Sequence, residues 1–147
     1  MRFVAVVLVA LAVTPVASAA LPNACTLISN TQVAPLIGGK VGTRIERGTS
    51  LYHTCTWTSV ARGHYGVHSV LTVSVGAETK AQFVHGAEQI PGAHPVAGLG
   101  QVAFMQKGGR GSISAWDKGY AVQIFGSLVQ VYPSRAKGVA KLAVAHL

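Results

Sequence analysis

The stretch LYHTCTWT, residues 51–58, decides how this 147-residue chain folds. Polar and apolar side chains alternate along it, and successive side chains of a β-strand point to opposite faces. The alternation predicts a strand in which Cys55 and Trp57 share one face with His53, while Tyr52 and the threonines lie on the other. We expect Cys55 and Trp57 to face the hydrophobic core.

The first residues of the chain bear on the redox state of Cys55. Arg2 precedes an unbroken apolar run over residues 3–13, and Ala17-Ser18-Ala19 supplies small residues before a cleavage point. This pattern is typical of a secretory signal peptide, whereas a membrane-spanning helix needs about twenty apolar residues. We expect residues 1–19 to be a signal peptide cleaved near Ala19. Residues 20–147 then form a single exported domain without a transmembrane segment.

Cys25 and Cys55 are the two cysteines of the chain. Export would place both in an oxidising compartment, where such a pair is expected to bond. We therefore expect a Cys25–Cys55 disulfide, which on the chain-entropy model stabilises the fold by about 3.7 kcal/mol. A lipid anchor on Cys25 is disfavoured because no lipobox precedes it. Zinc binding is disfavoured because the pair lacks the short C-x-x-C spacing.

Local signals on both sides of residues 51–58 predict further elements. Ser29 and Gln32 have the spacing of a capping box, which begins a short helix that ends at Gly38-Gly39. Alternation predicts strands over residues 40–47 and 67–75. A second helix is expected over residues 78–87, with an apolar stripe formed by Ala81, Phe83 and Val84.

The second half of the chain predicts a loop, three strands and a helix. Residues 90–100 contain two prolines and three glycines and indicate a loop, and a strand follows over residues 101–105. Asp117-Lys118-Gly119 suits a three-residue hairpin loop between strands 113–116 and 120–126. Pro133 can open a last helix. The buried face of that helix is expected to consist of Ala136, Val139, Ala140, Ala143 and Leu147.

The order of these elements predicts an α+β fold. We expect an antiparallel sheet of five to six strands, about three helices packed on one of its faces, and one disulfide.

Charge restricts the partners of the exported chain. Without Arg2, eleven Lys and Arg stand against four acidic residues, which gives a net charge of 11 − 4 = +7. This balance favours an anionic cell-wall polymer, a lipid head group or an acidic protein, and export argues against nucleic acid. If the charge does not merely maintain solubility, the candidate anion-binding residues are Arg44, Arg47, Lys107, Arg110, Arg135, Lys137 and Lys141.

The residue inventory offers no catalytic constellation. A glycosidase needs two carboxyl groups placed across one bond, and the four acidic residues all fall where solvated charges are expected. G-x-S-x-G is absent, and a disulfide removes both cysteines as nucleophiles. His64 and His68, four apart on a strand, stand about 13 Å from each other and cannot share one metal ion. We expect a binding module without catalytic residues, metal or cofactor, and the alternative is a small secreted hydrolase.

Several short motifs together resemble a group of small exported actinobacterial proteins of unknown function, many of them lipoproteins. These motifs are Cys25-Thr26-Leu27-Ile28-Ser29, Cys55-Thr56-Trp57-Thr58 and the Gly98-Leu99-Gly100 loop. The resemblance implies paired cysteines and a cell-envelope setting, and it implies no activity. This chain departs from the group because it lacks a lipobox, so we expect it to be secreted rather than lipid-anchored.

Overall fold

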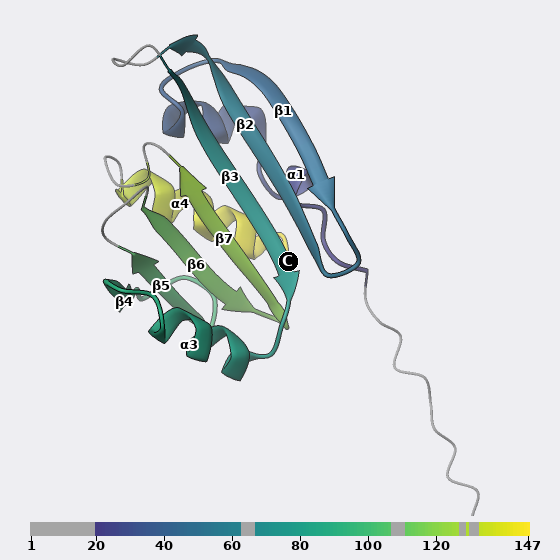
Figure 1. Ribbon diagram of the computed structural model, residues 1–147, viewed down its shortest axis with the longest axis vertical. Helices are drawn as coiled ribbons and strands as arrows, with labels where there is room; N and C mark the ends of the chain where they lie inside the picture. The colour runs from purple at the N-terminus through teal and green to yellow at the C-terminus, as the bar shows by residue number, and fades with distance from the viewer. Residues whose placement is uncertain (1–19, 63–66, 107–110, 127–128, 130–132) are drawn as a thin grey trace, which may run out of the picture.

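The computed structural model describes residues 20–62, 67–106, 111–126, 129 and 133–147 (Figure 1). The predicted signal peptide falls outside these residues. Seven antiparallel strands form one sheet in the order β1-β2-β3-β7-β6-β5-β4. The strands are β1 (Val41–Gly48), β2 (Tyr52–Arg62), β3 (His68–Ala77), β4 (Ala93–Pro95), β5 (Val102–Gln106), β6 (Ser112–Asp117) and β7 (Tyr120–Gly126). The helices are α1 (Ala24–Leu27), α2 (Asn30–Val33), the 3₁₀ helix η1 (Ala34–Leu36), α3 (Lys80–Glu88) and α4 (Pro133–Ala145).

The α+β class is confirmed, but the sheet has more strands than expected. The additional strand, β4, lies within residues 90–100, where the sequence indicated a loop. Its Pro95 pairs with Phe104 at the edge of the sheet, and an edge strand tolerates proline because one side of it carries no ladder hydrogen bonds. Pairing with β5 therefore creates a strand where local sequence signals a break.

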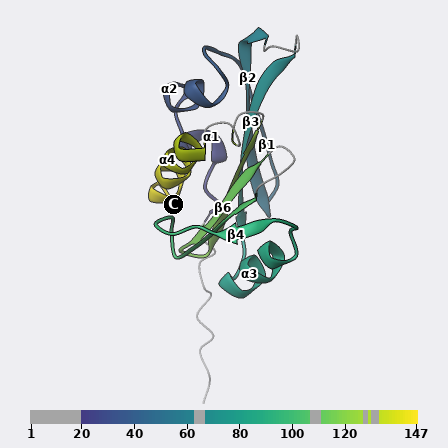
Figure 2. The ribbon, with the colours of Figure 1, turned by 90° about the vertical axis from the view of Figure 1, so that its left-hand side faces the viewer.

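One face of the sheet carries the hydrophobic core. Cys55 and Trp57 are fully buried on this face, as predicted from the alternation in β2. Val73 on β3 and Ile124 on β7 continue the same layer, because the strand register places each beside its neighbour. Figure 2 shows α1, α2 and α4 on this side of the sheet. We call this side the core face.

The N-terminal segment is fixed to the core face by caps and by a covalent bond. Asn23 caps α1 by accepting a hydrogen bond from the amide of Cys25, and the predicted capping box of Ser29 and Gln32 opens α2. The predicted Cys25–Cys55 disulfide is present, with the two Cα atoms 5.0 Å apart. The bond joins α1 directly to β2.

Helix α4 packs as its apolar spacing predicted. Ala136, Val139, Ala140 and Ala143 are buried, and Leu147 packs against the same core. The pattern succeeds here because one stripe of the helix lies against the sheet while the rest faces solvent.

Helix α3 lies on the opposite side of the sheet from the other helices, so the expectation that all helices share one face is wrong (Figure 2). Its Phe83 packs on Phe104 of β5, with ring centroids 6.0 Å apart. Phe83 and Ala87 are its buried residues, whereas Ala81 is exposed. The helix therefore covers one corner of the second face and leaves the rest open. We call this second face the open face.

The β6–β7 hairpin has a tighter turn than the sequence predicted. Asp117 pairs directly with Tyr120, so the loop has two residues rather than three. Lys118 and Gly119 both have positive φ, 50° and 90°, as a type I′ turn requires. This turn matches the twist of the two strands better than the expected type I turn.

Candidate functional site

The structure separates the predicted anion-binding residues. Arg44 and Arg47 are exposed on edge strand β1 but point to opposite faces, because Arg44 pairs with Trp57 and Arg47 with Thr54. They therefore do not form one surface. Lys107 and Arg110 lie outside the described residues.

The remaining predicted cations lie on α4, away from β1. Arg135 and Lys141 are exposed and Lys137 is half-buried. Since α4 packs on β6 and β7, and β7 lies three strands from β1 in the sheet, these residues lie apart from Arg44 and Arg47. Lys137 and Lys141 are four residues apart and share a face of α4, whereas Arg135 lies on another face. The tertiary structure thus distributes the positive charge over more than one part of the surface.

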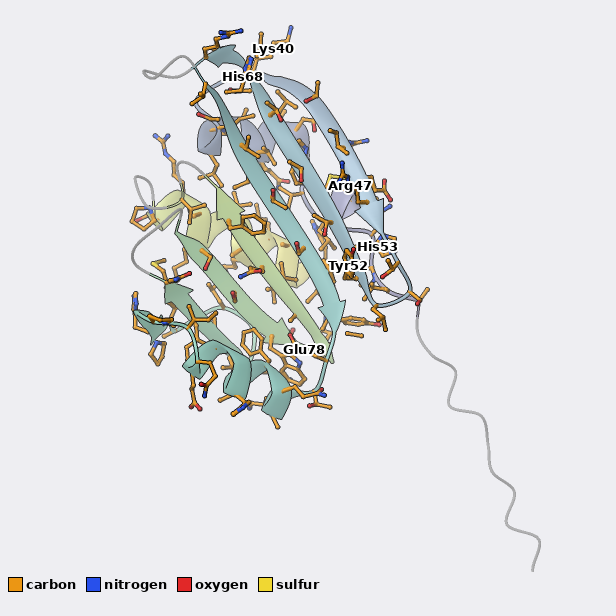
Figure 3. All side chains as sticks on the ribbon, viewed as in Figure 1. Lys40, Arg47, Tyr52, His53, His68 and Glu78 are labelled. Carbon is orange, nitrogen blue, oxygen red and sulfur yellow. A yellow bond between two sulfur atoms is a disulfide. The ribbon has the colours of Figure 1, made fainter. Side chains whose placement is uncertain are left out.

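A further basic region contains Lys40 and Arg62, which the sequence did not single out, and His68, which we considered only as a metal ligand. Arg62 at the end of β2 pairs with His68 at the start of β3. Lys40 precedes β1 and accepts a backbone hydrogen bond from Val60 at 2.9 Å. Figure 3 shows Lys40 and His68 at the same end of the sheet. We call the surface formed by Lys40, Arg62 and His68 the cationic end.

Apolar side chains are exposed beside these cations. Val60 is 54% exposed and Val67 is 65% exposed, and both belong to the end of the β2–β3 hairpin. His68 is fixed there because its Nδ1–H donates to the carbonyl oxygen of Ser59 at 2.8 Å. The cationic end therefore combines positive charge with exposed valine side chains on an ordered backbone.

The four acidic side chains of the chain lie away from the cationic end. Glu46, the acidic residue of β1, is six residues from Lys40, about 20 Å along an extended strand. Salt screens exposed charges beyond about 8 Å at physiological ionic strength. The positive charge of the cationic end is therefore not neutralised by the protein itself. The other acidic side chains are those of Glu78, Glu88 and Asp117.

The cationic end was missed because the extent of β2 was underestimated. The alternation ends at Thr58, yet β2 continues to Arg62 past an irregularity in its pairing with β3. Ser59 holds this region, since its hydroxyl donates to the carbonyl of Ala61 and accepts from the amide of Ser69. The sequence does carry one sign of this surface. Arg62 and His68 stand on either side of a short segment that begins and ends with glycine.

The open face contains a second set of candidate residues around Glu78. This carboxyl group follows β3, and burial raises its pKa above the ordinary value of 4.5. The backbone oxygen of Glu78 accepts a hydrogen bond from Trp116 Nε1 at 2.8 Å. Asp117 continues the core-face series of Ile113 and Ala115, so its carboxyl points away from the open face. Asp117 therefore cannot serve as the second carboxyl group of a glycosidase pair with Glu78.

The two tryptophans pack within the fold, and the described histidines belong to no metal site. Trp57 is a core residue, and Trp116 is half-buried beneath the start of α3. Among the residues that the structure describes, no group of three histidine, cysteine or acidic side chains could hold a metal ion. His64 lies outside those residues.

Comparison with known proteins assigns the chain to no family. No family model matches the chain, and neither a curated protein nor a solved structure was found to match it. Within the described ranges, every helix is too short or too polar to cross a membrane.

Proposed function

We propose that this protein is an exported, non-catalytic binding domain that attaches to an anionic lipid surface through its cationic end. The observation that carries the proposal is the grouping of Lys40, Arg62 and His68 beside exposed Val60 and Val67. The Cys25–Cys55 disulfide is compatible with a protein that works outside the cytoplasm. The resemblance to exported actinobacterial proteins supports the same cell-envelope setting.

The chemistry of the cationic end favours lipid over the other anionic partners. A wall polymer or an acidic protein would use the cations but would leave the two valine side chains in water. A lipid surface offers phosphate groups for the cations and, directly below them, an apolar layer for Val60 and Val67. Each Lys or Arg near an anionic membrane contributes about 1 kcal/mol, so two such residues give weak, reversible attachment.

Binding to vesicles tests this proposal. We expect the protein to cosediment with vesicles of phosphatidylglycerol and phosphatidylcholine, and to bind pure phosphatidylcholine much less. Lys40→Gln/Arg62→Gln should weaken binding about 30-fold, since two contacts of about 1 kcal/mol each are lost. Binding should also weaken steeply between low and physiological salt.

A second pair of substitutions separates the cationic end from net charge. Lys137→Gln/Lys141→Gln removes the same charge from α4 and should change binding less than threefold. Equal losses in the two double variants would show that only net charge matters. A larger loss in the α4 variant, or tight binding to an anionic polymer with none to vesicles, would contradict the proposal.

A further inference from the structure

The strand register aligns polar side chains in a row across the open face. Thr54 pairs with Ser74, Ser74 with Gln123, and Gln123 with Ser114. Residues paired in this way lie side by side on the same face of the sheet. The row crosses four adjacent strands, β2, β3, β7 and β6, which spans about 14 Å. We call it the polar row.

Three hollows adjoin along this row, and Gln123 lines all of them. The first, of about 270 Å³, lies between α3 and the sheet. The second, of about 390 Å³, lies over β2, β3 and β7 and shares Glu78 with the first. The third, of about 300 Å³, lies towards Gln106 and Phe125. The first and second share Glu78, Ala121 and Gln123, and the third meets them at Gln123, so we treat the three as one groove across the open face.

Small residues create the second hollow. Tyr52 pairs with Gly76, and Gly76 pairs with Ala121, which in turn pairs with Trp116. Glycine has no side chain and alanine only a methyl group, so this second cross-strand series is low in the middle and high at both ends. The aromatic ring of Tyr52 therefore stands at one side of the depression, and Tyr52 lines it.

Polar groups in the groove lack partners within the protein. Among the described residues, the side chains of Glu78, Gln123 and Ser114 make no hydrogen bond, although all three are half-buried. In contrast, the hydroxyls of Thr54 and Ser74 are 3.3 Å apart and bond to each other. The polar atoms of Glu78, Gln123 and Ser114 remain accessible to solvent, so a bound ligand can replace water as the hydrogen-bond partner.

The wall of the groove beside these groups is apolar. Phe83, Ala87 and Ile90 line the first hollow together with Glu78. Figure 3 shows Glu78 at the end of the sheet where β3 leads into α3. A ligand there meets a hydrogen-bonding floor and an apolar side wall, with charge restricted to one carboxyl group.

These features select a class of ligand. An anion would meet the Glu78 carboxyl where the first and second hollows join, and a cation would find one carboxyl and no second ligand of that kind. An extended peptide is bound at strand edges through backbone groups, whereas this groove crosses the face of the sheet. A sugar chain has hydroxyls for a row of amide and hydroxyl groups, and apolar ring faces for aromatic side chains.

We propose that the groove of the open face binds an uncharged oligosaccharide, with Gln123 as its central hydrogen-bonding residue. The site is separate from the cationic end and does not depend on the function proposed for that surface. Sugar hydroxyls would pair with Gln123, Ser114 and Glu78, and a sugar ring would lie against the exposed ring of Tyr52.

The test is an NMR titration of the ¹⁵N-labelled protein with cellopentaose, chitopentaose and mannopentaose as probes. We expect at least one probe to shift the amide resonances of Ser74, Ser114 and Gln123. Gln123→Ala should weaken that binding at least tenfold. Ala121→Leu should abolish it, because the larger side chain fills the second hollow and removes no hydrogen bond. Thr58→Ala is the control, because Thr58 faces the same way but lines none of the three hollows.

Salt distinguishes this site from the cationic end. Binding of an uncharged sugar should be the same at low and high NaCl, and Lys40→Gln/Arg62→Gln should not change it. The proposal is overturned if none of the three probes shifts these resonances at millimolar concentration. It is also overturned if Ala121→Leu, shown by its spectrum to be folded, binds the probe as the wild type does.

Discussion

Trp57 Nε1 donates a hydrogen bond to Oδ1 of Asn30 at 3.0 Å, which joins the centre of β2 to the first residue of α2. The indole ring is fully buried, whereas Asn30 is at the surface. The bond lies on the same strand as the Cys25–Cys55 disulfide, two residues further along. The N-terminal segment is therefore held on β2 by one covalent and one polar contact.

Removal of the acceptor should destabilise the fold modestly. We expect Asn30→Ala to lower the free energy of unfolding by about 1 kcal/mol, since water can reach part of the site and replace the lost partner. Asn30→Asp keeps an acceptor oxygen at the same place and should stay near the wild-type value. Urea denaturation measures both. Equal losses in the two variants would show that the hydrogen bond is not the cause.

Loss of the disulfide should have a larger effect. Cys25→Ala/Cys55→Ala opens a loop with a sequence separation of 30, and the chain-entropy model gives a loss of about 3.7 kcal/mol. Thermal unfolding of the oxidised protein, the reduced protein and the double variant measures this loss. Alkylation of two thiols in the exported protein without reductant would contradict the bond itself.

The carboxyl group of Glu78 should make stability depend on pH. Burial raises its pKa above 4.5, so the folded state binds this proton more tightly than the unfolded state does. The resulting stabilisation is present at pH values below 4.5 and is lost as the pH rises through the folded-state pKa. We expect Glu78→Gln to be more stable than the wild type at pH 7, with the difference vanishing at about pH 4. Urea denaturation at both pH values checks the sign, and a less stable variant at pH 7 would refute it.

Two glycine substitutions should have opposite effects. A Cβ atom at Gly126 would overlap the backbone carbonyl oxygen of Val70, so Gly126→Ala should cost about 1–3 kcal/mol through overpacking. A Cβ atom at Gly138 in α4 meets open space, so Gly138→Ala should stabilise by up to about 1 kcal/mol through helix propensity. Thermal unfolding of the two variants compares them. A stabilised Gly126→Ala would show that β3 and β7 can move apart at this point.

Elements whose signals are local could be predicted from the sequence. The alternation over residues 51–58 places Cys55 and Trp57 in the core, and the Ser29 capping box and the apolar face of α4 are present as predicted. Each of these signals depends on side chains a few residues apart, so the repeat of the strand or helix encodes it directly. The disulfide followed from a pair of cysteines with no alternative partner.

Elements that depend on distant partners could not be predicted. Residues 93–95 become β4 because β5 pairs with them, and α3 covers the open face because Phe83 meets Phe104. The candidate sites also depend on pairing between residues that are distant in the sequence. The cationic end needs the pairing of Arg62 with His68.

The sequence by itself determined which side chains of the alternating strands, such as Cys55 and Trp57, face the core, because the two-residue repeat of a strand is a local property. Only the tertiary structure decided which strands lie beside each other, and hence that Ser74, Gln123 and Ser114 share one row. These three residues come from β3, β7 and β6, and the first two are 49 positions apart in the chain. The physical reason is that cross-strand register results from packing the whole core and the turns together, and no local pattern encodes it.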